Sequence, residues 1–181
     1  LEDQSKLDEA LSAYNNSISL NPEYPEAYNK LGYVLQAQGK LEEALEAYIK
    51  SILLRPNYAE AYNNLGVTLG KQGKLEDAIE AYQKSISLKP NYAEAYSNMG
   101  NTLKDQGKLD EAIETYNKAK LLKPNDPDVY YNLANTFQEL GRLDEAEISF
   151  RQAILWKSDF AEANHNLSFT LLSNGKLKEG L

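Results

Sequence analysis

Hydrophobic residues recur along this chain with the spacing of one face of an α-helix. Over residues 59–72, Tyr62, Leu65 and Leu69 are three and four positions apart, which is the spacing of neighbours on a helix with 3.6 residues per turn. Gly73 follows this stretch. Glycine adopts a left-handed backbone without a steric penalty and commonly ends helices. The pattern predicts a helix that stops at this glycine.

A second stripe with helical spacing occupies residues 75–88. It begins with acidic residues such as Glu76, which complement the positive end of the helix dipole. Pro90 prevents its continuation. Asn91 is followed three residues later by Glu94, which predicts a capping box at the start of the next helix. Two helices joined by a short turn form an antiparallel helical hairpin.

This hairpin pattern repeats every 34 residues. The repeated turn glycines are Gly39, Gly73, Gly107, Gly141 and Gly175. A single globular core would not impose such a period, whereas a stack of near-identical units would. We therefore predict one all-α solenoid over residues 1–181, with half a repeat at 1–24, full repeats at 25–58, 59–92, 93–126 and 127–160, and a partial repeat at 161–181.

Small and large residues alternate within each predicted hairpin. Gly66 and Ala78 recur in the other repeats, and we expect them where two helix backbones approach closely. Tyr62 and Tyr82 are expected to fill the space between hairpins.

The repeat resembles the tetratricopeptide repeat, whose pattern appears here as Tyr62, Leu65, Gly66, Leu69, Ala78, Tyr82, Ser85 and Pro90. The resemblance covers the whole chain. Its departures are Ala134 and Ser168 at the first-helix glycine, Asn164 at the aromatic and Ser158 at the proline. It implies a right-handed superhelical solenoid, in which the first helix of each hairpin lines a concave groove that holds peptide segments of partner proteins.

Successive residues of a helix are rotated by about 100°. This rotation places one row of residues on the side of each predicted first helix that is opposite its hydrophobic stripe. It consists of Lys30, Asn64, Asn98, Asn132 and Asn166. Asparagine is a poor helix former, and its amide can both donate to and accept from a peptide backbone. The row resembles the asparagine ladder in the tetratricopeptide superhelix of O-linked N-acetylglucosamine transferases. The amides either bind peptide backbone, or tie adjacent repeats together, or reflect recent duplication.

Two further rows accompany the asparagines. The positions that vary most in chemistry are Tyr33, Val67, Asn101, Asn135 and Phe169, and we expect them to determine specificity if they do not reflect drift. The acidic row is Glu26, Glu60, Glu94, Asp128 and Glu162. It is either an acidic surface that selects basic partners or, as we favour, a set of capping-box carboxylates.

Composition narrows the function classes. The 27 acidic and 19 basic side chains give a net charge of -8, which disfavours nucleic acid and membrane surfaces as partners. There is no cysteine, in keeping with a reducing, cytoplasmic location. The single histidine, His165, has no second metal-ligating neighbour. The glycine–lysine pairs at the turns lack the remaining residues of a phosphate loop. We expect no catalytic site, metal or cofactor.

Three functions remain open on the sequence. We favour a scaffold for protein partners that binds peptides in the groove. The alternatives are the substrate-recruiting arm of a larger enzyme, such as a glycosyltransferase, and a self-assembling structural module.

The repeat register also leads to predictions for the two ends of the chain. By the repeat register, Leu1 lies at the end of a first helix and Leu181 inside a second helix, so the chain reads as a piece of a longer protein. Exposed packing faces at both ends predict weak end-to-end self-association. In the last repeat, Phe169 and Leu172 place apolar groups outside the packing stripe. They either receive a further element or lie in the groove.

Overall fold

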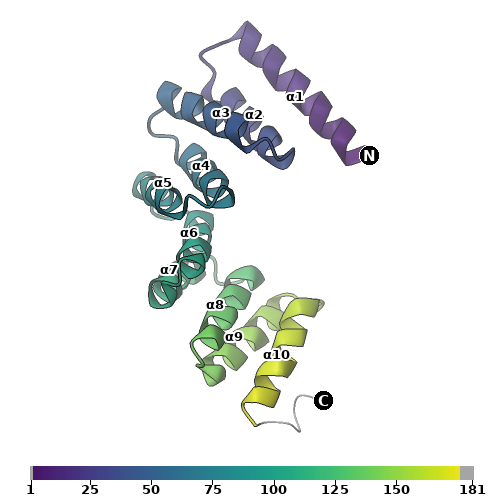
Figure 1. Cartoon of the computed structure of the whole chain (residues 1–181), viewed down its shortest axis with the longest axis vertical. Helices are drawn as coiled ribbons and strands as arrows, with labels where there is room; N and C mark the ends of the chain where they lie inside the picture. The colour runs from purple at the N-terminus through teal and green to yellow at the C-terminus, as the bar shows by residue number, and fades with distance from the viewer. Residues whose placement is uncertain (1, 176–181) are drawn as a thin grey trace. The chain divides into compact units, whose positions relative to one another are not determined.

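The computed structural model describes residues 2–175, which form ten α-helices and no strands (Figure 1). The helices are α1 (Glu2–Leu20), α2 (Pro25–Ala37), α3 (Leu41–Leu54), α4 (Ala59–Lys71), α5 (Leu75–Leu88), α6 (Ala93–Asp105), α7 (Leu109–Leu122), α8 (Pro127–Glu139), α9 (Leu143–Trp156) and α10 (Ala161–Ser173). We call α2, α4, α6, α8 and α10 the first helices, and α3, α5, α7 and α9 the second helices. None of these ten helices is long and apolar enough to cross a membrane.

The chain divides into two compact units, residues 1–90 and 91–181. In the first unit, α2 pairs with α3 and α4 with α5, while α1 packs on α2 and α3 on α4. In the second unit, α6 pairs with α7 and α8 with α9, and α10 packs on α9. Each unit is therefore built from antiparallel hairpins, and the predicted all-α solenoid fold is confirmed.

Glycines end the first-helix segments as expected. Gly73 has a φ of 76°, and the other four turn glycines have φ between 72° and 77°. This left-handed conformation is easy for glycine and costly for residues with a Cβ. The turn lets the second helix fold back on the first.

The first-helix glycine makes room for an aromatic ring, and not for a second backbone as we expected. A Cβ on Gly66 would lie 2.7 Å from Cε1 of Tyr82, well inside van der Waals contact. The tyrosine is 3% exposed. Glycine therefore lets the ring of the second helix lie directly on the first helix.

The structure corrects the expected capping box. Helix α6 begins at Ala93, so its N-cap is Tyr92, which makes no side-chain capping bond. The carbonyl of Tyr92 accepts from the backbone N–H of Ala95 at 3.1 Å. Asn91 lies one position too early to cap. Among the described first helices, only α8 has a capping side chain at its N-terminus, since Asp126 accepts from the N–H of Asp128.

Helix α1 also differs from expectation. Leu1, which was expected at the end of a first helix, lies outside the described residues, and residues 2–20 form one continuous helix. The physical reason is Ser5, which stands 34 residues before Gly39. A serine does not favour the left-handed conformation that makes the turn at the other repeats. The expected second helix around Leu181 lies outside the described residues.

Candidate functional site

The first helices of the second unit border an open recess of about 520 Å³. Its lining comes from α6, α8 and α10 and consists of Lys104, Tyr131, Asn135, Gln138, Glu139, Asn166 and Phe169. Two of these, Asn135 and Asn166, are residues that the sequence predicted for peptide binding. Phe169 was predicted either for the groove or for packing against a further element.

The Asn166 amide is fixed by two neighbours on α8. Its Nδ2 donates to Oδ1 of Asn135 at 3.0 Å and to the hydroxyl of Tyr131 at 3.3 Å. The two bonds use both donors of this amide. Within residues 2–175, Oδ1 of Asn166 and Nδ2 of Asn135 make no further hydrogen bond. The recess therefore presents one free acceptor and one free donor group, held in place by the network.

The rest of the lining is mixed in character. The Phe169 ring is 59% exposed, so it offers apolar surface to a ligand. Lys104 Nζ lies 3.7 Å from a carboxylate oxygen of Glu139, which balances the charge of the recess. This arrangement can bind through hydrogen bonds and apolar contact.

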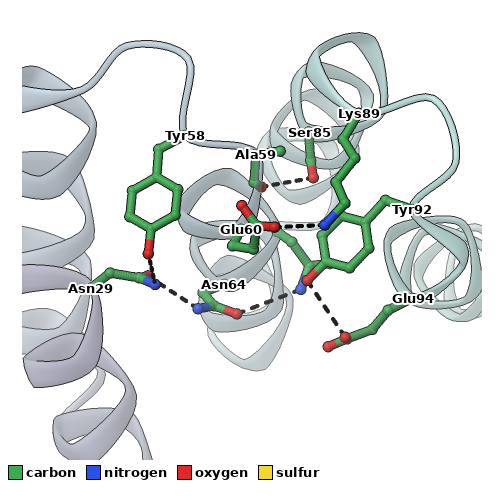
Figure 2. A network of polar contacts seen from close by, with 10 residues as sticks. Asn29, Tyr58, Ala59, Glu60, Asn64, Ser85, Lys89, Tyr92 and Glu94 are labelled. Atoms are coloured by element: carbon green, nitrogen blue, oxygen red, sulfur yellow. Dashed lines mark hydrogen bonds and ion pairs between the residues drawn. The ribbon is translucent and has the colours of Figure 1, made fainter. Parts of the chain in front are cut away.

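In the first unit, asparagines link adjacent first helices (Figure 2). Asn64 Nδ2 on α4 donates to Oδ1 of Asn29 on α2 at 3.1 Å. Asn29, which is only 4% exposed, donates to the hydroxyl of Tyr58 at 3.2 Å. For Asn64 and Asn166, then, the structure supports the alternative in which the amides tie adjacent repeats. Periodicity did not reveal Asn29, because it faces neither the packing stripe nor the predicted row.

The other predicted binding residues differ in exposure and in partners. Lys30 is exposed, and Tyr33 is 60% exposed. Asn101 accepts a hydrogen bond from the Tyr116 hydroxyl at 2.7 Å, so its side chain is tied to the second helix of its own hairpin. Half-buried positions are Val67, Asn98, Asn101, Asn132 and Asn135.

The acidic row is paired with cations in the first unit, which the sequence did not predict. Glu26 forms an ion pair with Arg55, and Glu60 accepts from Lys89 Nζ at 2.6 Å (Figure 2). The bond from Lys89 lowers the pKa of the Glu60 carboxyl below its usual value. A recurrent basic residue after each second helix, namely Arg55, Lys89, Lys123 and Lys157, is the signal that could have revealed these pairs.

These pairs replace the capping-box interpretation at Glu60. This residue is the second of α4, one position short of where a capping box requires it. The carboxylate instead bridges its helix to the basic residue that follows the second helix. Across residues 2–175, no three His, Cys, Asp or Glu side chains group in a way that could hold a metal ion.

Repeat-family models match most of the chain. One described as TPR repeat matches residues 3–39 and 100–141, and three described as tetratricopeptide repeat match residues 23–91, 81–114 and 127–160. A comparison with curated proteins gave no match.

Solved structures are similar over nearly the whole chain. MamA is 30% identical, with a TM-score of 0.77 over 89% of this chain and 94% of that one. TTC0263, a thermophilic TPR protein in Thermus thermophilus, is 25% identical, with a TM-score of 0.76 over 95% and 94%. YrrB, described as a TPR protein with an unusual peptide-binding site, is also 25% identical, with a TM-score of 0.73 over 92% and 86%.

Proposed function

Because the chain belongs to the tetratricopeptide repeat family, we propose that it is a protein-interaction scaffold that holds an extended peptide of a partner protein against its first helices. Proteins of this family are generally scaffolds without catalytic activity. One similar protein, YrrB, is described as having a peptide-binding site. The observation that carries the proposal is the recess between α6, α8 and α10, with its fixed Asn166 amide.

The two free amide groups match a peptide backbone. An extended peptide offers a C=O acceptor and an N–H donor from its main chain. The free Nδ2 donors of Asn135 would bind the C=O, and Oδ1 of Asn166 would accept the N–H. Because the network already orients both amides, less side-chain entropy is lost when the peptide binds.

Phe169 gives the recess its preference among side chains. An exposed aromatic ring favours apolar or aromatic partners, which it removes from water on contact. The ion pair between Lys104 and Glu139 has no net charge, so it adds no strong preference for a charged ligand. We therefore propose that the bound segment carries an apolar side chain at the position next to Phe169.

A selection from a displayed library of short random peptides, followed by binding isotherms of the selected peptides, tests this function. Asn166→Ala should weaken binding about fivefold, since one net hydrogen bond contributes about 1 kcal/mol. Phe169→Ala should weaken it more, through lost apolar contact. Lys118→Ala, an exposed substitution on the second helix α7, is the matched control and should leave binding unchanged.

Selected peptides that bind both groove variants as tightly as the unchanged chain would contradict the proposal. A loss of binding in the Lys118 control would do the same, because it would place the peptide on the second helices. End-to-end self-association stays a prediction from the sequence.

A further inference from the structure

Tyr131 lines the recess between α6, α8 and α10, although the other described first helices have no tyrosine at this place in the repeat. At intervals of 34 residues, the equivalent positions carry Asn29, Asn63, Ser97 and His165. The side chain of Tyr131 is half-buried. Stacking of the repeats therefore does not require an aromatic residue at this position, and its presence on the recess needs another explanation.

Two buried rings hold Tyr131 in place. Its ring centroid lies 4.9 Å from that of Phe160 and 5.9 Å from that of Phe150, and both pairs are tilted. Phe150 is fully buried, and Phe160 is 6% exposed. Tilted aromatic pairs at such distances attract each other beyond the effect of buried area. The core of the second unit therefore fixes the ring, while the side chain also borders the recess.

The first unit has a different pair of residues at the equivalent place (Figure 2). At the position of Tyr131, Asn29 accepts from Asn64 and donates to the hydroxyl of Tyr58 at 3.2 Å. Phe160 occupies the position of Tyr58 in the repeat. In the second unit, an aromatic pair thus replaces a hydrogen-bonded pair. The exchange moves the hydroxyl from the residue before a first helix onto a first helix.

The hydroxyl hydrogen of Tyr131 is available to a ligand. The oxygen accepts from Nδ2 of Asn166 at 3.3 Å, and a phenol can donate as well as accept. Within residues 2–175, this hydroxyl donates to no acceptor. Oδ1 of Asn135 lies 3.0 Å from the same Nδ2, so the hydroxyl and the Asn135 amide are neighbours. Helix α8 therefore offers two adjacent donors, the Tyr131 hydroxyl and Nδ2 of Asn135.

Two adjacent donors match one carbonyl oxygen. A peptide C=O has two lone pairs and can accept two hydrogen bonds. Both donors are neutral, and the ion pair between Lys104 and Glu139 has no net charge. This balance favours a neutral carbonyl over a carboxylate.

We propose that Tyr131 is a specificity-determining residue of the recess, and that its hydroxyl donates to the same main-chain carbonyl of the bound peptide as the Asn135 amide. This inference rests on the proposed function. Because Phe150 and Phe160 fix the Tyr131 ring before the peptide arrives, little side-chain entropy is lost on binding. The carbonyls of a helical segment are already bonded to its own N–H groups. The recess therefore selects an extended segment over a helical one.

Peptides with single backbone esters test this contact. We would take a peptide selected on the unchanged chain and replace its main-chain amides by esters one at a time, because an ester carbonyl is a weaker acceptor. Each peptide is titrated calorimetrically into the unchanged chain and into the Tyr131→Phe variant, which keeps the ring and removes only the hydroxyl. Tyr130→Phe on the same helix is the matched control. The Tyr130 hydroxyl donates to the carbonyl of Pro124 at 2.9 Å, and Tyr130 does not line the recess.

Tyr131→Phe should weaken binding of the unmodified peptide about fivefold, as expected for one net hydrogen bond. Tyr130→Phe should change it less than twofold. At one position of the peptide, the ester should weaken binding at least threefold less in the Tyr131→Phe variant than in the unchanged chain. Non-additivity of this kind identifies two groups in direct contact, and a merely structural role of the hydroxyl would not produce it.

Three results would overturn the inference. Unchanged binding by Tyr131→Phe, with weaker binding by Asn166→Ala and Phe169→Ala, would do so and leave the proposed function standing. Ester effects that are equal in the unchanged chain and in Tyr131→Phe would show that the hydroxyl acts only by orienting Asn166. Unchanged binding by all three variants would contradict the proposed function itself, and the inference with it.

Discussion

At the scale of single residues, the contact between glycine and tyrosine decides how closely the helices of a hairpin approach. Gly66→Ala would place a Cβ 2.7 Å from the Tyr82 ring. Overpacking of this kind typically costs about 1–3 kcal/mol, which offsets the gain in helix propensity of roughly 1 kcal/mol. We expect a net loss of stability, measured by urea denaturation.

Lys71→Ala, an exposed substitution in the same helix, serves as the control and should change stability by no more than about 0.5 kcal/mol. A Gly66→Ala variant as stable as the unchanged chain would show that the ring moves aside without cost.

Side-chain networks were harder to foresee from the sequence than turns. The turn glycines could be assigned because a positive φ strongly favours one residue type. The hydrogen bond from Asn64 to Asn29 could not be predicted, because an amide at that position can bond equally well to a ligand or to a neighbouring repeat. Only the positions of the helices in the structure show which of these contacts forms.

At the scale of helices, the starts of the first helices differ from one another. Asp126 caps α8 through its bond with the N–H of Asp128 at 3.1 Å, and it also pairs with Lys123. Asp126→Ala should therefore destabilise the chain by about 1 kcal/mol. Asn91→Ala should be nearly neutral, although the sequence predicted Asn91 as a cap. Thermal unfolding of both variants shows whether Asp126, as in the structure, or Asn91, as predicted from the sequence, acts as a helix cap.

A comparable loss of stability in Asn91→Ala would contradict this assignment and restore the capping box.

The sequence predicted the existence and type of the helices well, because the stripes of hydrophobic residues are long and regular. It failed at α1, where Ser5 replaces the turn glycine and the helix continues.

At the scale of the molecule, most contacts lie within one of the two units, so a substitution should destabilise mainly the unit that contains it. Tyr48 is fully buried in the first unit, and Tyr48→Ala should cost roughly 3–5 kcal/mol as a core truncation. In repeat proteins the loss spreads mainly to neighbouring repeats. Amide hydrogen exchange should therefore accelerate more in residues 2–90 than in residues 91–175. Equal acceleration in both ranges would indicate one global cooperative core.

The central claim is that the first helices of this scaffold hold a partner's peptide. The most direct test is an NMR titration of the isotopically labelled chain with a peptide selected for binding. The account predicts side-chain amide shifts at Asn135 and Asn166 and contacts between the peptide and the Phe169 ring. Shifts confined to the second helices α7 and α9, with both asparagine amides unchanged, would contradict it.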